Sequence, residues 1–239
     1  MITLCAHRGG ALLWPENSLT AFRNAVALPI EEVECDVHLS LDGEVMVHHD
    51  ATLDRMTEGT GPIAHYTAEQ LSLIPIRGLT EGMPRLAELL ELVAESGKLL
   101  RLEIKADHEN RHDPALLAAV RRELDRVPAD VRVMSFQPAT LAPGLFDEQD
   151  LLIRPQDMGW HDSELLNAIA LALHCSGIGF GYETGFLPET LPGITGITNI
   201  WRADTEEALV RSFAMRPDSI TTDDPVLALK LRDGVMKPA

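Results

Sequence analysis

Seven side chains in the first half of the chain have the types and the spacing needed for phosphodiester chemistry. Three carboxylates could bind a divalent cation, two imidazoles could transfer protons, and one guanidinium and one ammonium group could hold a phosphate. Most of them lie within the first fifty residues, and the last two follow in the apolar run 99–105. They are His7, Arg8, Glu34, Asp36, His49, Glu103 and Lys105.

The carboxylates predict a metal site. Glu34 and Asp36 are two residues apart in an apolar run, so on a strand they point to one side while Cys35 points to the other. If Glu103 approaches from the next strand, each pair of ionised carboxylates about 4 Å apart would repel by about 4 kcal/mol at an effective dielectric constant of about 20. A divalent cation or a shared proton would relieve this repulsion, and ligands that are all oxygens favour Mg²⁺ or Ca²⁺.

The histidines are candidates for acid and base catalysis. His7 ends the first apolar run, and His49 follows a short run at 44–48, so the two could approach a phosphorus atom from different sides. Imidazole suits both roles because its pKa lies near neutrality. The spacing leaves open which histidine is the acid. Arg8 and Lys105 are expected to contact the non-bridging phosphate oxygens.

Short runs rich in Val, Ile and Leu alternate with amphipathic segments along the whole chain, a pattern typical of βαβ units around a parallel sheet. Eight principal strands in 239 residues favour a TIM barrel, whose active site lies at the carboxyl ends of the strands. The expected strands are 2–7, 32–37, 99–105, 131–136, 151–155, 176–181, 196–201 and 219–222, with a short extra one at 44–48.

No change of composition marks a second domain, so we expect residues 1–239 to form one domain. Residues 50–83 are rich in turn formers and have weak periodicity, which predicts an insertion between barrel strands. Two helix starts are readable. Asp113 precedes a proline at a first-turn position, and Asp204 begins a capping-box pattern that ends at Glu207.

Charge and composition restrict the partners and the location. Twenty Lys and Arg residues against thirty-seven Asp and Glu give a formal charge of −17, so we expect no nucleic-acid partner. No apolar stretch approaches the roughly 20 residues that cross a bilayer, and no export signal precedes the first strand. Three widely spaced cysteines favour free thiols in a reducing compartment, and we expect a cytoplasmic protein. The oligomeric state stays open.

The motifs, taken in order, resemble the glycerophosphodiester phosphodiesterase family. The resemblance extends over nearly the whole chain and is most specific before Lys105. One departure follows the strand at 196–201, where the family usually has Trp-Thr-Val-Asn and this chain has Trp201-Arg-Ala-Asp204. The motifs that carry the resemblance are His7-Arg-Gly9, Pro15-Glu-Asn17, Ala21-Phe22, Glu34-x-Asp36, Asp42-Gly43, Val47-His-His-Asp50, Leu53-Asp-Arg55, Glu103-Ile-Lys105, Ser135-Phe136 and Thr222-Asp-Asp-Pro225.

The resemblance implies a TIM barrel with a small insertion at 50–83 and a metal-dependent hydrolase that splits glycerophosphodiesters into sn-glycerol 3-phosphate and an alcohol. It implies one divalent cation, Mg²⁺ or Ca²⁺, and a role in lipid and glycerol metabolism. Trp14, Phe136, Phe186 and Trp201 are candidates for an apolar side of the cleft, with Trp201 against the glycerol. The implied roles are metal ligation by Glu34, Asp36 and Glu103, acid–base catalysis by His7 and His49, and substrate binding by Arg8, Lys105, Phe136 and Trp201.

Three alternatives remain at the level of sequence. A metal-dependent barrel aldolase or isomerase would also use carboxylates and histidine, but it gives no reason for two histidines beside the acids. A lysophospholipase D-like enzyme would need a longer groove for the acyl chain. A non-catalytic module that binds glycerophosphodiesters would need all the catalytic positions to be filled and yet inactive.

Overall fold

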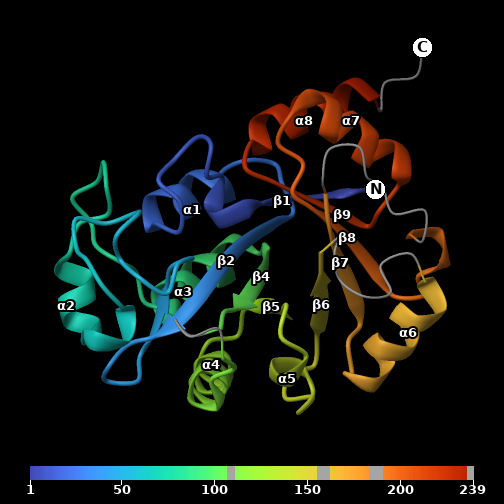
Figure 1. Ribbon diagram of the computed structural model, residues 1–239. Helices are drawn as coiled ribbons and strands as arrows, with labels where there is room; N and C mark the ends of the chain where they lie inside the picture. The colour runs from blue at the N-terminus through green and yellow to red at the C-terminus, as the bar shows by residue number, and fades with distance from the viewer. Residues whose placement is uncertain (107–110, 155–161, 183–190, 236–239) are drawn as a thin grey trace.

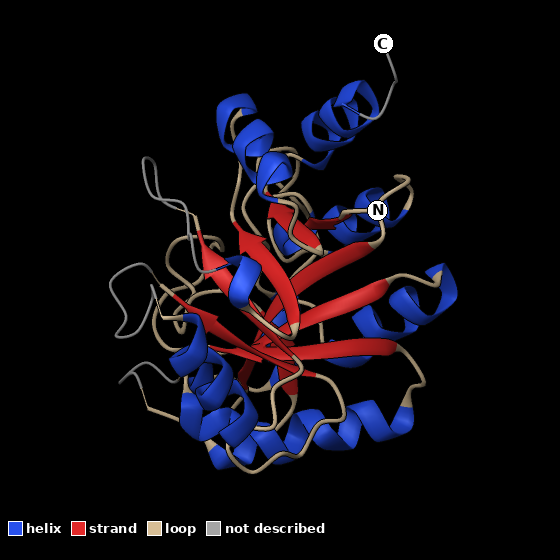
Figure 2. Cartoon of the chain, turned by 90° about the vertical axis from the view of Figure 1, so that its right-hand side faces the viewer, coloured by secondary structure: helices blue, strands red, loops and turns tan. Residues whose placement is uncertain are grey.

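The computed structural model describes residues 1–106, 111–154, 162–182 and 191–235. Within them, eight parallel strands close into a barrel that is surrounded by helices (Figure 1, Figure 2). The barrel closes where β1 pairs with both β2 and β9, and a short antiparallel strand, β3 (Val45–Val47), pairs with β2. The predicted TIM barrel is confirmed. Its strands are β1 (Thr3–Ala6), β2 (Glu32–Leu39), β4 (Leu99–Ile104), β5 (Asp130–Ser135), β6 (Gln149–Ile153), β7 (Gly177–Gly181), β8 (Ile197–Trp201) and β9 (Ser219–Thr222).

The helices follow the strands as the alternation predicts. Their bounds are α1 (Leu19–Val26), α2 (Ala68–Leu73), α3 (Leu86–Ser96), α4 (Pro114–Arg126), α5 (Pro138–Leu141), α6 (Ser163–Ala172), α7 (Glu206–Met215) and α8 (Pro225–Val235). Among the described helices, none is both long enough and apolar enough to cross a membrane.

One of the two predicted helix starts is confirmed and the other is wrong. The Asp113 side chain accepts a hydrogen bond from the backbone of Ala115 and caps α4. The cap of α7 is Thr205, whose hydroxyl accepts from the backbone of Ala208. Asp204 instead accepts a hydrogen bond from the backbone N–H of Asp223 at 2.7 Å, so its carboxylate supports the end of β9 rather than the helix.

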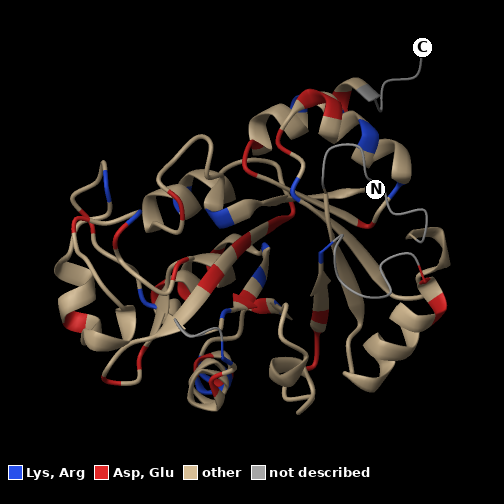
Figure 3. Ribbon diagram, viewed as in Figure 1, with Lys and Arg blue, Asp and Glu red and all other residues tan. Residues whose placement is uncertain are grey.

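The outward faces of the strands form the main hydrophobic core. Val33, Cys35 and Val37 of β2 are fully buried and belong to one cluster with Phe22 of α1 and Leu89 of α3. Alternation along the strand turns Glu32, Glu34 and Asp36 to the opposite side, into the barrel. Figure 3 shows acidic residues along β2. In β2 the apolar half therefore packs against the helices, while the acidic half faces the interior.

A buried network of ion pairs fills the lower part of that interior. Arg101 of β4 donates to Glu32 of β2 at 2.5 Å and to Asp150 of β6 at 3.0 Å. Arg132 of β5 donates to the second oxygen of Asp150 at 2.8 Å. Gly177 of β7 leaves room for this network, since a Cβ there would lie 2.6 Å from an oxygen of Asp150.

Residues 50–83 lie to one side of the barrel with α2 (Figure 1). They have a small hydrophobic cluster of their own, which includes Leu53, Ile63, Leu71 and Met83 and reaches the barrel through Met46 of β3. Irregular bridges rather than a sheet hold the segment together. Its turn-rich sequence therefore still buries apolar side chains.

Replacing Arg101 with leucine is expected to lower the free energy of unfolding by about 3–5 kcal/mol, because Glu32 loses its cation and Asp150 loses one of its two. Urea denaturation followed by circular dichroism measures the change. The control is Arg126→Leu, which removes an ion pair with Glu123 at an arginine side chain that is 71 % exposed, and it is expected to cost less than about 1 kcal/mol. Equal losses in the two variants would contradict a structural role for the network.

Candidate active site

A tight turn at the end of β1 places His7 and Arg8. Residues His7–Gly9 form a single 3-10 turn in which Arg8 has a φ of 51° and Gly9 a φ of 80°. Gly9 packs directly on α1, and a Cβ at this position would lie 2.9 Å from the Cβ of Ala21. Glycine is therefore required here both by the positive φ and by the close approach of the helix.

Glu34, Asp36 and Glu103 converge at the upper end of the barrel interior. Each offers a carboxylate oxygen, and these oxygens all lie within 4.8 Å of one another. The side chains come from adjacent strands, because Asp36 of β2 is in register with Glu103 of β4. All three residues are buried, with exposures of 2 %, 0 % and 8 %.

Asp36 is held by cations on two sides. Lys105 Nζ lies 3.1 Å from one of its oxygens, and Arg8 Nε lies 3.2 Å from the other, which also accepts a hydrogen bond from the Asn17 side chain. Lys105 also donates to Glu103 at 2.9 Å. Burial alone would raise the pKa of Asp36, but Lys105 and Arg8 hold it below its usual range. Asp36 is therefore ionised.

The other two carboxylates are short of positive charge. Burial and the neighbouring Asp36 raise the pKa of Glu34 to about 8, and burial also raises the pKa of Glu103. One oxygen of Asp36 receives no hydrogen bond from the described residues although Lys105 lies beside it. Three buried oxygens with two poorly compensated acids fit a hard divalent cation, which would supply the missing charge.

His7 is oriented by an acid that follows the last barrel strand. Its Nδ1 lies 2.5 Å from a carboxylate oxygen of Asp223, and its Nε2 faces Glu34 at 3.9 Å. Burial lowers the pKa of His7, but Glu34 and the hydrogen bond to Asp223 outweigh it, and the pKa is raised. Asp223 lies in a motif of the resemblance but was not predicted to have a role. The available signal was its place just after β9, the strand that pairs with β1.

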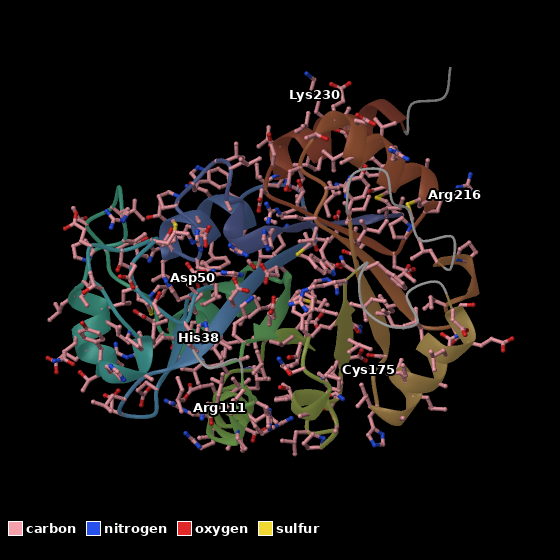
Figure 4. The ribbon with its side chains drawn as sticks, viewed as in Figure 1. His38, Asp50, Arg111, Cys175, Arg216 and Lys230 are labelled. Carbon is pink, nitrogen blue, oxygen red and sulfur yellow. The ribbon has the colours of Figure 1, made fainter. Side chains whose placement is uncertain are left out.

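His49 is oriented by its neighbour in the chain. Its Nδ1 lies 2.7 Å from Asp50, whose other oxygen accepts from Arg55 at 2.6 Å. The buried ring of His38 donates from Nε2 to the backbone carbonyl of His49 at 3.0 Å. Burial lowers the pKa of His49 and lowers that of His38 to about 4, so His38 is a neutral donor. Figure 4 labels His38 and Asp50, which lie near β2 on the side of residues 50–83.

Glu16 connects the support of His49 to Arg8. Arg55 makes a two-pronged contact with the Glu16 carboxylate at 2.7 and 3.0 Å, and Arg8 donates to the same carboxylate at 3.0 Å. Neither Glu16 nor Arg55 was singled out as functional from the sequence, although both lie in motifs of the resemblance. A chain of ion pairs thus runs from Arg55 in the 50–83 segment through Glu16 to the Arg8 guanidinium beside the acidic cluster.

The predicted site residues surround one cavity of about 320 Å³. Eight of the nine line it, and Asp36 lies directly beneath through its contacts with Arg8 and Lys105. On the far side, Phe136 and Trp201 pack edge to face with centroids 5.1 Å apart, and the Arg154 guanidinium lies 3.8 Å from the centre of the Phe136 ring. Six further residues line the cavity without having been predicted from the sequence: Met134, Leu152, Arg154, Asn199, Arg202 and Thr221.

Of the other aromatic candidates, Trp14 does not line this cavity. It packs against the main core beside Gly10, where a Cβ would lie 3.0 Å from its ring. Phe186 lies outside the described residues.

Comparison with known proteins identifies related chains. Residues 7–143 match the model of the glycerophosphoryl diester phosphodiesterase family. A glycerophosphodiester phosphodiesterase of Caldanaerobacter subterraneus subsp. tengcongensis is 29% identical over 246 residues, covering 95% of this chain and 96% of that one. Another, of Bacillus altitudinis, is 28% identical and covers 98% and 99% of the two chains.

Solved structures agree in fold. A protein from Agrobacterium tumefaciens assigned as a glycerophosphoryl diester phosphodiesterase superposes with a TM-score of 0.90 at 27% identity, covering 99% of this chain and 100% of that chain. A phosphodiesterase of Oleispira antarctica, solved with the product sn-glycerol-3-phosphate, gives a TM-score of 0.83 at 23% identity and covers 97% and 96%. The second similarity concerns the fold alone.

Binding of a divalent cation is expected to release a proton at pH 7, because the pKa of Glu34 is about 8 in the metal-free protein. The cation displaces that proton, so affinity should rise by up to about tenfold per pH unit below this pKa and level off above it. Isothermal titration with Mg²⁺ or Ca²⁺ in two buffers of different ionisation enthalpy measures the proton count. Glu34→Gln should remove the release and weaken binding, whereas an affinity independent of pH would contradict the expectation.

Proposed function

The chain belongs to the glycerophosphoryl diester phosphodiesterase family and is therefore a phosphoric diester hydrolase, and we propose that it cleaves glycerophosphodiesters to sn-glycerol 3-phosphate and an alcohol. The observation that carries this proposal is the buried acidic cluster at one cavity with two histidines, each paired with its own carboxylate. The product bound to the Oleispira antarctica phosphodiesterase supports the identity of the phosphate product.

In this proposal, Glu34, Asp36 and Glu103 hold one divalent cation, Mg²⁺ or Ca²⁺. When bound, such a cation would act as a Lewis acid toward the phosphate oxygens and offset the charge that develops on them. Arg8 and Lys105 already touch the acidic cluster and line the same cavity, so their positive charges also face the phosphate. In this proposal the bound cation and these two side chains together offset the negative charge of the phosphodiester.

His7 and His49 then transfer the protons. An oxygen nucleophile, water or the neighbouring glycerol hydroxyl, forms a bond to phosphorus and loses its proton to one histidine. The bond between phosphorus and the alcohol oxygen breaks, and the other histidine gives its proton to that oxygen. When the glycerol hydroxyl attacks first, water later opens the cyclic phosphate with the same pair of groups. Asp223 and Asp50 orient the rings through Nδ1, which directs each Nε2 to the reaction.

Phe136 and Trp201 form the apolar wall against which the glycerol carbons lie. Trp201 has room for its indole because β7 carries Gly179 beside it, where a Cβ would lie 3.2 Å from the Trp201 ring. The indole Nε1 is buried without a hydrogen-bond partner among the described residues. We propose that this N–H donates to a substrate hydroxyl, which would satisfy it.

We further propose that residues 1–239 form one domain, supported by the chain leaving the barrel after β3 into residues 50–83 and returning through α3 to β4. A cytoplasmic location is proposed on the buried free thiols of Cys5 and Cys35, which form no disulfide. Nucleic acid is not expected as a partner because of the formal charge of −17.

A metal-by-substrate screen tests the function. The substrates are glycerophosphocholine, glycerophosphoethanolamine, glycerophosphoglycerol and glycerophosphoinositol, with a lysophospholipid for comparison. We expect release of sn-glycerol 3-phosphate from the water-soluble diesters, loss of activity with a chelator, and recovery with Mg²⁺ or Ca²⁺ because the acidic cluster needs the cation. An enzyme-coupled assay for glycerol 3-phosphate measures the rate of its release. Substrate binding without cleavage in the presence of every metal tested would contradict the proposal. Activity that survives the chelator would show that the reaction does not need the cation.

The histidine pair is tested by His7→Ala and His49→Ala. Each variant is expected to lower kcat by about 10²- to 10⁴-fold with a smaller change in KM, because proton transfer is lost while the phosphate contacts remain. Steady-state kinetics at saturating metal give both constants. His65→Ala, at an exposed histidine of the 50–83 segment, is the control and should retain full activity. A near-normal kcat in both catalytic variants would end the proposed mechanism.

A further inference from the structure

Two residues that follow β8 contact the acid that orients His7. β8 pairs with β9 (Figure 1), and the chain after β8 stays beside the end of β9, because Ala203 is fully buried and donates its backbone N–H to a β9 carbonyl at 3.0 Å. Arg202 and Asp204 flank this alanine, and both reach Asp223. The segment after β8 therefore adds contacts behind the pair of His7 and Asp223.

Arg202 and Asp204 hold Asp223 at different atoms. One oxygen of the Asp223 carboxylate lies 2.5 Å from His7 Nδ1, and the other lies 2.8 Å from Arg202 Nε. Asp204 accepts a hydrogen bond from the Asp223 backbone N–H at 2.7 Å with one oxygen, and with the other it accepts from the same Arg202 Nε at 2.6 Å. The three residues thus form a closed ring of contacts in which one N–H faces two carboxylates.

The Arg202 guanidinium supplies positive charge to both carboxylates at this place. The side chains of Asp204 and Asp223 are only 20 % and 9 % exposed, so water screens their charges poorly. Burial raises the pKa of Asp223, but His7 and Arg202 outweigh burial and lower it, so Asp223 is ionised. Without Arg202, two negative charges would meet beside His7, and their repulsion would displace the Asp223 carboxylate from the imidazole.

We propose that Arg202 is a positioning residue for the reaction: by compensating Asp204 and Asp223 together, it holds the Asp223 carboxylate against Nδ1 of His7. The imidazole, fixed in this way, presents Nε2 to the substrate. The proposal rests on the proposed function, in which His7 transfers a proton. Arg202 lines the same cavity as His7, but this role needs no contact between its guanidinium and the substrate.

The charges at 202 and 204 occur together, where this chain departs from the family's usual motif. In place of threonine and asparagine, the chain has Arg202 and Asp204, one cation and one anion. A threonine and an asparagine would bring no charge to Asp223, and the asparagine amide oxygen could still accept the backbone N–H of Asp223. The acid at 204 therefore creates the need for the arginine at 202, and this need is predicted to vanish when residue 204 is neutral.

The test compares Arg202→Thr with the double variant Arg202→Thr/Asp204→Asn, which restores both of the family's usual residues. Arg202→Thr is expected to lower kcat for glycerophosphocholine by about 10- to 100-fold with KM within about threefold, because a displaced imidazole transfers protons poorly while the phosphate contacts remain. The double variant is expected to recover kcat to within about threefold of the wild type, since the uncompensated charge at 204 is gone. Steady-state kinetics at saturating Mg²⁺ or Ca²⁺ give both constants.

A spectroscopic measurement follows His7 without turnover. The Nδ1 proton that His7 shares with Asp223 gives a downfield imidazole signal in proton NMR, and the signal is assigned by its loss in His7→Ala. In the metal-free protein labelled with ¹⁵N-histidine, Arg202→Thr is expected to move this signal upfield or to remove it through faster exchange with water. The double variant is expected to restore it.

Arg211→Thr is the matched control. Arg211 lies on α7 and pairs with Glu207 of the same helix at 3.6 Å, so its loss should change neither kcat nor the His7 signal. If Arg202→Thr does not fold, Arg202→Gln takes its place with the same expectations, because glutamine keeps more of the side-chain length without the charge.

The outcomes separate positioning from substrate binding. A raised KM in Arg202→Thr that the double variant does not recover would show that Arg202 binds the substrate directly, and the positioning role would be wrong. Equal losses of kcat in the single and double variants, or a normal kcat with an unmoved His7 signal in the single variant, would also overturn the proposal. If the wild type cleaves no glycerophosphodiester in any metal, the proposed function fails, and the His7 signal then decides on its own: movement in Arg202→Thr with recovery in the double variant supports positioning, and an unmoved signal rejects it.

Discussion

The repulsion among three buried carboxylates is the constraint around which this molecule is built. Glu34, Asp36 and Glu103 bring their oxygens within 4.8 Å of one another inside a closed barrel, where burial weakens screening by water. Arg8 and Lys105 stabilise Asp36, but the pKa of Glu34 remains raised to about 8. The protein alone thus leaves the cluster short of positive charge. That deficit distinguishes the cluster from a fully compensated structural ion-pair network and is the reason for proposing a cation there.

The lower interior of the barrel shows that contrasting case. Glu32 is on the same face of β2 as Glu34, yet Arg101 brings a full positive charge to it and lowers its pKa against the effect of burial. Asp150 receives two arginines, Arg101 and Arg132. Strand alternation therefore places acids at both levels, where two arginines face two lower acids, and Arg8 and Lys105 face three upper acids. The lower acids hold strands together, and the upper acids are left available for a ligand.

The barrel could be predicted from the sequence because alternation and periodicity are local patterns, and the same patterns place most of the nine proposed site residues at strand ends. Alternation along β2 fixes the side of Glu34 and Asp36, and the position of His7 after an apolar run fixes the end of the barrel. Asp223 was not assigned because its contact with His7 joins residues 216 positions apart. Thr205 rather than Asp204 caps α7, since the competing hydrogen bond from the Asp223 backbone is a tertiary contact. Long-range pairs of this kind leave no periodic pattern in the sequence from which they could be predicted.

The two histidines are supported by different parts of the fold, which gives residues 50–83 a role in the site. His7 depends on the barrel alone, because Asp223 follows β9 and β9 pairs directly with β1. His49 depends on Asp50, and Asp50 is held by Arg55 from the inserted segment, which in turn reaches Arg8 through Glu16. The hydrophobic cluster around Leu53 anchors that segment to β3. Packing in the insertion thus fixes the position of Arg55, which supports His49 through Asp50 and Arg8 through Glu16. An insertion that lacks regular secondary structure over most of its length can contribute in this way because a few buried apolar residues suffice to hold one arginine in place.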